Sequence, residues 1–109
     1  MKINNIPFSF INWDVLPSHI NKGETGETVS KIFEKDNFRA RLIEYSVNYK
    51  ADHWCSKGHN GLILDGDLTI KINDGREFLL KQGMSFVVAD DFDIHQVFSV
   101  NGAKVFIID

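Results

Sequence analysis

The chain has 109 residues, of which 43% are hydrophobic and 25% charged, and its formal net charge at pH 7 is −3. This length suits one folded domain that buries roughly 65% of the unfolded surface. The weak negative charge argues against a phosphate-binding surface and no apolar run is long enough to cross a membrane, so neither nucleic acid nor a membrane is an expected partner.

The sequence contains one cysteine, Cys55, which cannot form a disulfide within the chain. The first residues lack the apolar region of a signal peptide. Free thiols are typical of reducing compartments. We therefore expect a cytoplasmic protein whose thiol is free to pack, react or bind a metal.

The chain before residue 38 is expected to form N-terminal strands and a loop. Residues 8–13 alternate loosely and predict a short strand, whereas residues 17–26 are polar, contain glycine and predict a loop. Residues 27–33 alternate more regularly and predict a strand. Residues 34–37 indicate a turn, and residues 38–49 predict a long strand.

Short segments with strand character follow, separated by turn residues. We expect strands at 62–64, 68–72, 77–80, 84–88, 95–100 and 104–108. The turns between them are indicated by residues 65–67, 73–75, 81–83 and 101–102, where Asn, Asp and Gly tolerate positive φ. No segment has a sustained apolar period of 3.6, and such strand spacing is typical of antiparallel sandwiches and barrels. The sequence therefore predicts an all-β fold with residues 1–109 in one domain.

The stretch ADHWCSKGH, residues 51–59, concentrates side chains that bind metals. If it is an extended strand, His53 and Cys55 point to the same face. His59 could return to the same point if Gly58 lets the chain bend. A neighbouring strand would supply a further ligand, for which the remaining histidines are His19 and His95. Imidazole and thiolate are common ligands of divalent transition metals.

The spacing of these residues resembles the two motifs of the cupin superfamily. In the first, G-x5-H-x-H-x3-4-E-x6-G, the histidines fall on His53 and Cys55, the glutamate on His59 and the closing glycine on Gly66. The second, G-x5-P-x-G-x2-H-x3-N, opens at Gly83, and its histidine falls on His95, one residue late. The resemblance implies a single-domain cupin, an antiparallel double-stranded β-helix or jelly-roll barrel. Residues 38–109 would form the barrel and carry both motifs.

The sequence also departs from these motifs. The leading glycine, second histidine and glutamate of the first motif are replaced by Val47, Cys55 and His59, and the proline, glycine and asparagine of the second by Ala89, Asp91 and Ser99. The stretch ADHWCSKGH and the closing GAKVFIID look most like a small subgroup of single-domain cupins named for an Asp-His-Cys-Trp-type motif. That resemblance implies a metal pocket and no particular reaction.

We therefore expect a divalent metal held by His53, His59 and His95, with Cys55 as a further candidate ligand. This set is softer than three histidines and a glutamate, which favours zinc or iron, with nickel, cobalt or manganese as alternatives, over magnesium or calcium. Four bound side chains would make a closed zinc site. If Cys55 stays off the metal, three histidines leave open positions, which resembles the iron centre of cupin thiol dioxygenases.

Two functions are compatible with such a site. One is a mononuclear metal oxygenase, isomerase or related enzyme that acts on a small molecule inside the barrel. Its catalytic residues are unknown, and the candidate general bases are Tyr45, Asp90 and Asp91. The alternative is a non-catalytic module that binds a small molecule and contains structural zinc or no metal.

Two surfaces are open to interpretation. Many small cupins pair through their sheets, so we expect a homodimer whose seam includes Phe8, Phe10 and Trp13. Alternate residues of the long strand share one face: Arg39, Arg41, Ile43, Tyr45, Val47 and Tyr49. We interpret this face as a solvated or interface stripe. The alternative is an Arg and Tyr pair that faces into the barrel and suits a small anionic substrate.

Overall fold

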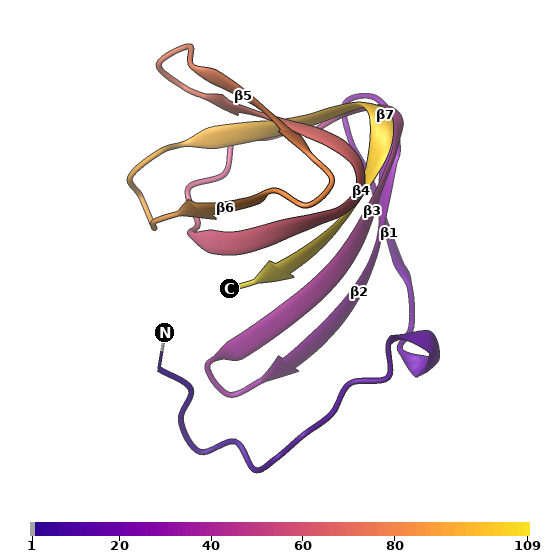
Figure 1. The fold of residues 1–109 in the computed structure, drawn as a ribbon, viewed down its shortest axis with the longest axis vertical. Coiled ribbons are helices and arrows are strands. Elements are labelled where there is room, and N and C mark those ends of the chain that lie inside the picture. Colours follow the sequence, from indigo (N-terminus) through magenta and orange to yellow (C-terminus); the bar gives the residue numbers. More distant parts are fainter. Residues whose placement is uncertain (1) are drawn as a thin grey trace.

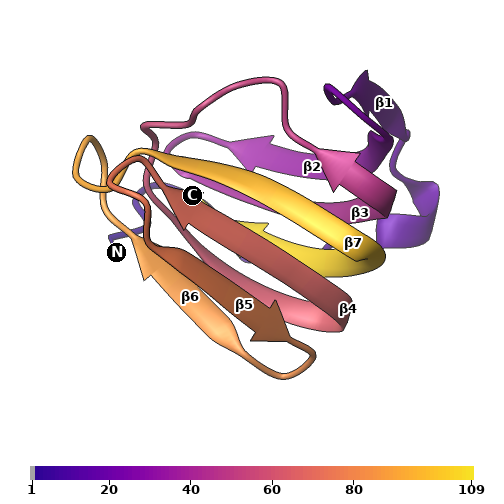
Figure 2. The same ribbon diagram turned by 90° about the horizontal axis from the view of Figure 1, so that it is seen from above.

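The computed structural model describes residues 2–109, in which seven strands form one strongly curved antiparallel sheet (Figures 1 and 2). A short 3-10 helix, η1 (Trp13–Val15), precedes the sheet. The strands are β1 (His19–Lys22), β2 (Glu27–Lys35), β3 (Phe38–Lys50), β4 (His59–Ile72), β5 (Glu77–Lys81), β6 (Ser85–Val88) and β7 (His95–Ile108). Within these residues, no helix has the length and apolar character needed to cross a membrane.

The last strand, β7, lies between β3 and β4 in the middle of the sheet, whose order is β1-β2-β3-β7-β4-β5. Val105 of β7 pairs with Ile43 of β3 on one side and with Ile63 of β4 on the other. The other edge of β4 pairs with β6 along its first residues and with β5 along its last. This arrangement brings the start of β4 and both ends of β7 close to segments far away in the sequence.

The core is made mainly by one face of the three long strands, with Leu80 of β5 added to it. Along β7, the buried residues Ala103, Val105 and Ile107 alternate with more exposed neighbours, as expected for a strand with one face covered. Val105 is fully buried and Ile63 is 1% exposed. The buried cluster consists of Ile43, Ile63, Leu68, Ile70, Ile72, Leu80, Ala103, Val105 and Ile107.

Turns with strong local signals form where the sequence predicts them. Gly75, with φ of +101°, closes the turn between β4 and β5, and its N–H donates to the carbonyl of Ile72 at 3.0 Å. Gly83, with φ of +89°, occupies the next turn. The strands expected at 27–33, 38–49, 77–80 and 84–88 are confirmed as β2, β3, β5 and β6, with ends that differ by up to two residues.

The turns expected at residues 65–67 and 101–102 are wrong. Both stretches lie inside continuous strands, β4 and β7, and the register between these strands shifts after Ile63 and again after Gly66. Gly66 has φ of +74°, and a Cβ on it would lie 2.1 Å from the carbonyl oxygen of Gly102. The glycines therefore allow the two long strands to bend where they lie against each other. The local sequence pattern predicts that the chain reverses its direction at these points.

The N-terminal expectations are also wrong. Residues 8–13 form no strand, and Phe8 and Phe10 are 93% and 83% exposed. The loop expected at 17–26 contains β1, in which Ile20 pairs with Val29 of β2. A segment without alternating apolar residues can form a strand when a neighbouring strand provides backbone hydrogen bonds. Here β2 pairs with the polar segment and makes it a strand.

Candidate metal centre

The segment between β3 and β4, residues 51–58, is not the extended strand that the alternation suggested. Cys55 instead forms an isolated bridge with His95 at the start of β7. The N–H of Cys55 donates to the carbonyl of His95 at 2.7 Å, and the N–H of His95 donates back at 3.0 Å. Residues paired in this way carry their side chains on the same face, so the backbone places the thiol beside the imidazole.

Gly58 brings this loop against the segment that joins β6 and β7. Its N–H donates to Oδ1 of Asp90 at 2.6 Å. A Cβ on Gly58 would lie 2.7 Å from the carbonyl oxygen of Val88 and from the backbone nitrogen of Asp90, so only glycine fits without a backbone shift. The next residue, His59, begins β4 and faces His95 across this junction.

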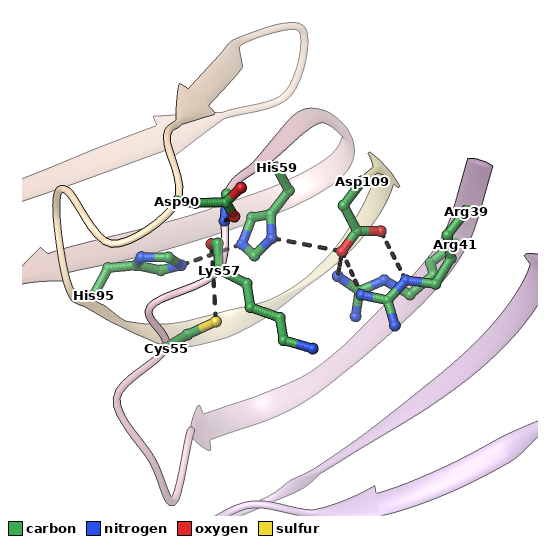
Figure 3. A network of polar contacts seen from close by, with 9 residues as sticks. Arg39, Arg41, Cys55, Lys57, His59, Asp90, His95 and Asp109 are labelled. Carbon is green, nitrogen blue, oxygen red and sulfur yellow. Dashed lines mark hydrogen bonds and ion pairs between the residues drawn. The ribbon is translucent and has the colours of Figure 1, made fainter. Parts of the chain in front are cut away.

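Cys55, His59 and His95 form a compact group in which one ligand atom from each lies within 4.8 Å of the others (Figure 3). Nε2 of His59 is 3.2 Å from Nε2 of His95. His95 is 2% exposed and the side chain of His59 is 9% exposed. A thiolate and two imidazoles in a sheltered place are a donor set suited to zinc, iron and similar ions.

The surroundings of the two rings indicate which nitrogens face the group. Nδ1 of His95 lies 2.9 Å from the carbonyl oxygen of Asp93, and because a carbonyl only accepts, this nitrogen carries the proton. Nδ1 of His59 is buried and has no hydrogen-bond partner within residues 2–109, and Oδ2 of Asp109 lies 3.7 Å from it. With a proton on that Nδ1 as well, both Nε2 atoms direct lone pairs at one point, where a cation would stabilise them. The residues therefore fit a divalent metal ion.

The protonation of His59 agrees with such a role. Burial, together with the charges of His95 and Arg41, lowers the pKa of His59 to about 4. Its imidazole is therefore neutral at neutral pH, which is the form that binds metals.

Asp109, which follows β7, lies behind the ring of His59 and is fixed by two arginines of β3 (Figure 3). Arg39 donates to both carboxylate oxygens, and Arg41 donates from Nη2 to Oδ2 at 2.9 Å. Burial alone raises the pKa of Asp109, but the hydrogen bond from Arg39 and the charges of both arginines outweigh it and lower the pKa. The carboxylate is therefore ionised at neutral pH. The sequence reasoning missed this contact, because the two arginines lie 68 and 70 residues before their partner.

A cavity of ≈ 360 Å³, here called the inner cavity, adjoins the metal-binding group. Cys55, His59 and His95 lie in its wall. The remaining wall is mixed: its apolar part includes Ile43, Leu68, Phe86, Val97 and Ile107, and its polar part includes Asn21, Lys22, Thr28, Ser30 and Asp52. From β3, the lining also includes Arg41, Tyr45 and Tyr49. The interpretation of this face of β3 as a solvated or interface stripe is therefore wrong for the residues that line the cavity, whereas Val47 is 62% exposed and does not contribute.

The other candidate residues lie around this cavity or outside it. His53 lines the cavity, but its side chain is 67% exposed, its Nδ1 lies 2.8 Å from Oδ1 of Asp52, and it is not a member of the three-residue group. His19 lies in the exposed strand β1. Burial raises the pKa of Tyr45, so its phenol stays neutral and suits a hydrogen-bond donor better than a base. Asp90 accepts the Gly58 N–H, and Asp91 is exposed.

Comparison of the fold with solved structures gives clear matches. An RmlC-like cupin from Shewanella frigidimarina NCIMB 400 superimposes with a TM-score of 0.74 at 13% identity, over 94% of this chain and 89% of that one. The chain has the cupin fold. The polyketide cyclase RemF from Streptomyces resistomycificus matches with a TM-score of 0.75 at 13% identity, over 94% of this chain and 78% of that one.

A third match is HppE, solved with Fe(II) and the alternative substrate (S)-1-HPP. Its TM-score is 0.76 at 13% identity, over 94% of this chain and 60% of that one. No protein-family model and no curated protein matches the sequence. The cupin architecture predicted from the two motifs is confirmed, whereas membership of the Asp-His-Cys-Trp subgroup stays a prediction.

Proposed function

We propose that this cupin binds one divalent metal ion through Cys55, His59 and His95, beside a cavity that accepts a small molecule. The observation that carries the proposal is the pair of imidazoles, whose Nε2 atoms face each other at 3.2 Å with the thiol of Cys55 nearby. Zinc or iron suits these ligands best, with nickel, cobalt or manganese as alternatives. When bound, the metal would supply Lewis-acid or oxygen-activating chemistry.

The protein's own residues orient the ligands and shape the cavity. The carbonyl of Asp93 fixes the ring of His95 by a hydrogen bond, and the carboxylate of Asp109 lies behind the ring of His59 at ion-pair distance. Tyr45, kept neutral by burial, can donate a hydrogen bond to a bound molecule. One fold neighbour contains Fe(II) with a substrate and another is a polyketide cyclase, so cupins of this shape accommodate metals and small molecules.

Three protein ligands would leave positions on the metal free for the small molecule, which favours an oxygenase, an isomerase or a related enzyme. His53 lies on the rim of the same cavity. A fourth bond from His53 would close the site and favour the alternative, a non-catalytic binding module with structural zinc.

Elemental analysis of protein purified without chelator or nickel resin tests the proposal. We expect about one equivalent of metal, lost in His59→Ala and in His95→Ala and kept in the matched control His53→Ala. Iron at this level supports the open-site enzyme, and zinc that survives dialysis supports the structural site. Loss of metal in His53→Ala as well indicates four ligands. Equal metal content in wild type and His59→Ala would rule out the ligand assignment.

A further inference from the structure

Arg41 lies between two cavities. It lines the inner cavity and also a second one of ≈ 360 Å³, here called the outer cavity, whose wall includes Arg39, Trp54 and Lys57. Four residues belong to both walls: Arg41, His53, Cys55 and His59. A molecule bound at Arg41 therefore lies next to two of the three proposed metal ligands.

The outer cavity is positively charged in an otherwise acidic protein. Its wall carries three permanent cations, Arg39, Arg41 and Lys57, and one carboxylate, Asp109. The whole chain has a formal charge of −3. Cationic clefts attract anions and raise their local concentration, so this surface favours a negatively charged ligand.

The side chain of Arg41 has donors that the protein does not use. Its Nη2 binds Asp109, but its Nε is buried without a hydrogen-bond partner among the described residues. That Nε is closed to solvent, whereas the Arg41 side chain as a whole is 20% exposed, so an anion can approach the other guanidinium nitrogens. A ligand carboxylate can accept a charge-assisted hydrogen bond from the guanidinium.

The inner cavity next to Arg41 suits the rest of such a ligand. Tyr45 and Tyr49 follow Arg41 on the same face of β3, and their rings pack edge to face at 5.1 Å. Phe86 and Leu68 extend the apolar wall toward the imidazoles. An inorganic anion would leave this apolar surface uncovered, whereas an organic acid would cover it.

We propose that the small molecule is a carboxylic acid, whose carboxylate binds Arg41 while its apolar part enters the inner cavity beside the metal ligands. The inference rests on the proposed function, because it names the ligand class of the same site. Arg41 provides the anion contact, and Arg39 and Lys57 attract the anion to the outer cavity.

Calorimetric titration with defined probes tests this assignment. Propionate and benzoate are compared with propionamide and benzamide, which have the same shape and no charge, and with inorganic phosphate. Each probe is titrated into metal-free and Co(II)-loaded protein. We expect at least one carboxylate to bind at least ten times more tightly than its amide, and Arg41→Gln to abolish this preference. Arg39→Gln is the matched control, because Arg39 also binds Asp109 but lines only the outer cavity.

The outcomes separate this inference from the metal proposal. The absorption of Co(II) reports the metal group by itself, and circular dichroism verifies that each variant is folded. A carboxylate preference that depends on Arg41 in protein that does not bind Co(II) would support the anion site and contradict the metal site. Amides that bind as well as acids, tighter binding of phosphate, or equal losses in the two arginine variants would overturn the inference.

Discussion

Oδ2 of Asp109 lies 3.7 Å from Nδ1 of His59, while Nε2 of the same ring faces His95 at 3.2 Å. The carboxylate thus lies behind the ring, on the side away from the proposed metal position (Figure 3). At 3.7 Å the contact is at ion-pair distance rather than a hydrogen bond, and the negative charge favours the tautomer that carries the proton on Nδ1. Asp109 is therefore a positioning residue for the metal group, held in place by Arg39 and Arg41.

The first prediction concerns this carboxylate. Asp109→Asn should weaken Co(II) binding by about 10- to 100-fold, the usual effect of losing an outer partner of a ligand. Asp93→Asn is the matched control, because His95 donates to the backbone carbonyl of Asp93, which the substitution keeps. Competition against a chelator measures both affinities. Equal affinities in the two variants would show that His59 does not depend on Asp109.

The second prediction concerns Cys55, whose thiol is not paired in a disulfide. If the thiolate binds the metal, Co(II)-loaded protein has a sulfur-to-cobalt charge-transfer absorption, and Cys55→Ala should abolish it and weaken binding. Cys55→Ser should weaken binding too, because a hydroxyl is a poorer ligand than a thiolate for these metals. A spectrum of Cys55→Ala identical to that of wild type would remove the thiol from the ligand set and leave two imidazoles.

The third prediction concerns the pH dependence of stability in metal-free protein. The pKa of His59 is about 4 in the folded chain and near 6.5 when unfolded, so the unfolded state binds more protons between these values. The free energy of unfolding should therefore fall as the pH drops from 6.5 to 4, by up to about 3 kcal/mol. Asp109, whose pKa is lowered, adds a further loss below its unfolded value.

Urea denaturation at several pH values measures this effect. His59→Asn should flatten the dependence between pH 6.5 and 4, because the substituted side chain does not titrate. His19→Asn, in the exposed strand β1, serves as the control and should keep the wild-type slope. Parallel curves for wild type and His59→Asn would contradict the assignment.

The fourth prediction concerns Gly58, which lets the loop with Cys55 approach the segment before β7. Gly58→Ala introduces a Cβ at 2.7 Å from two backbone atoms, so the loop must move. We expect a loss of about 1–3 kcal/mol in unfolding free energy, typical of overpacking, together with weaker Co(II) binding. The neighbouring exposed Ser56→Ala is the control. Unchanged metal affinity in folded Gly58→Ala would show that the loop position does not determine the site.

The parts of the fold that could be predicted are those with a local cause. The turn at Gly75 and the long strand β3 follow from residues within a few positions of each other. The bends at Gly66 and Gly102 have the same local signature as turns, but continuous pairing between β4 and β7 keeps the chain extended. Whether such a glycine forms a turn or a bend within a strand depends on pairing between segments far apart in the chain. A single sequence does not reveal that pairing.

The residues of the site also fall into those that the sequence predicted and those that only the structure reveals. The motif spacing indicated His59 and His95, and the structure brings them together with Cys55. Alternation suggested that His53 and Cys55 share a face, but the bridge to His95 positions Cys55 alone. Asp109 was missed because its contacts with β3 depend on the pairing of β3 with β7. The sequence does show an acidic residue directly after the last strand. Its arginine partners can be identified only when the register between β3 and β7 is known.

The fifth prediction concerns self-association. Phe8 and Phe10 are 93% and 83% exposed, and β1 forms an exposed edge of the sheet, whereas Trp13 packs against Phe106 of its own chain at 6.1 Å. We expect light scattering after gel filtration to give the mass of a homodimer, because a second copy would cover these rings. Phe8→Ser with Phe10→Ser should shift the mass to that of a monomer. Phe92→Ser, at an 80% exposed residue between β6 and β7, is the control and should leave the dimer intact. A monomeric wild type would contradict the prediction, and a dimer that persists in the double variant would place the seam elsewhere.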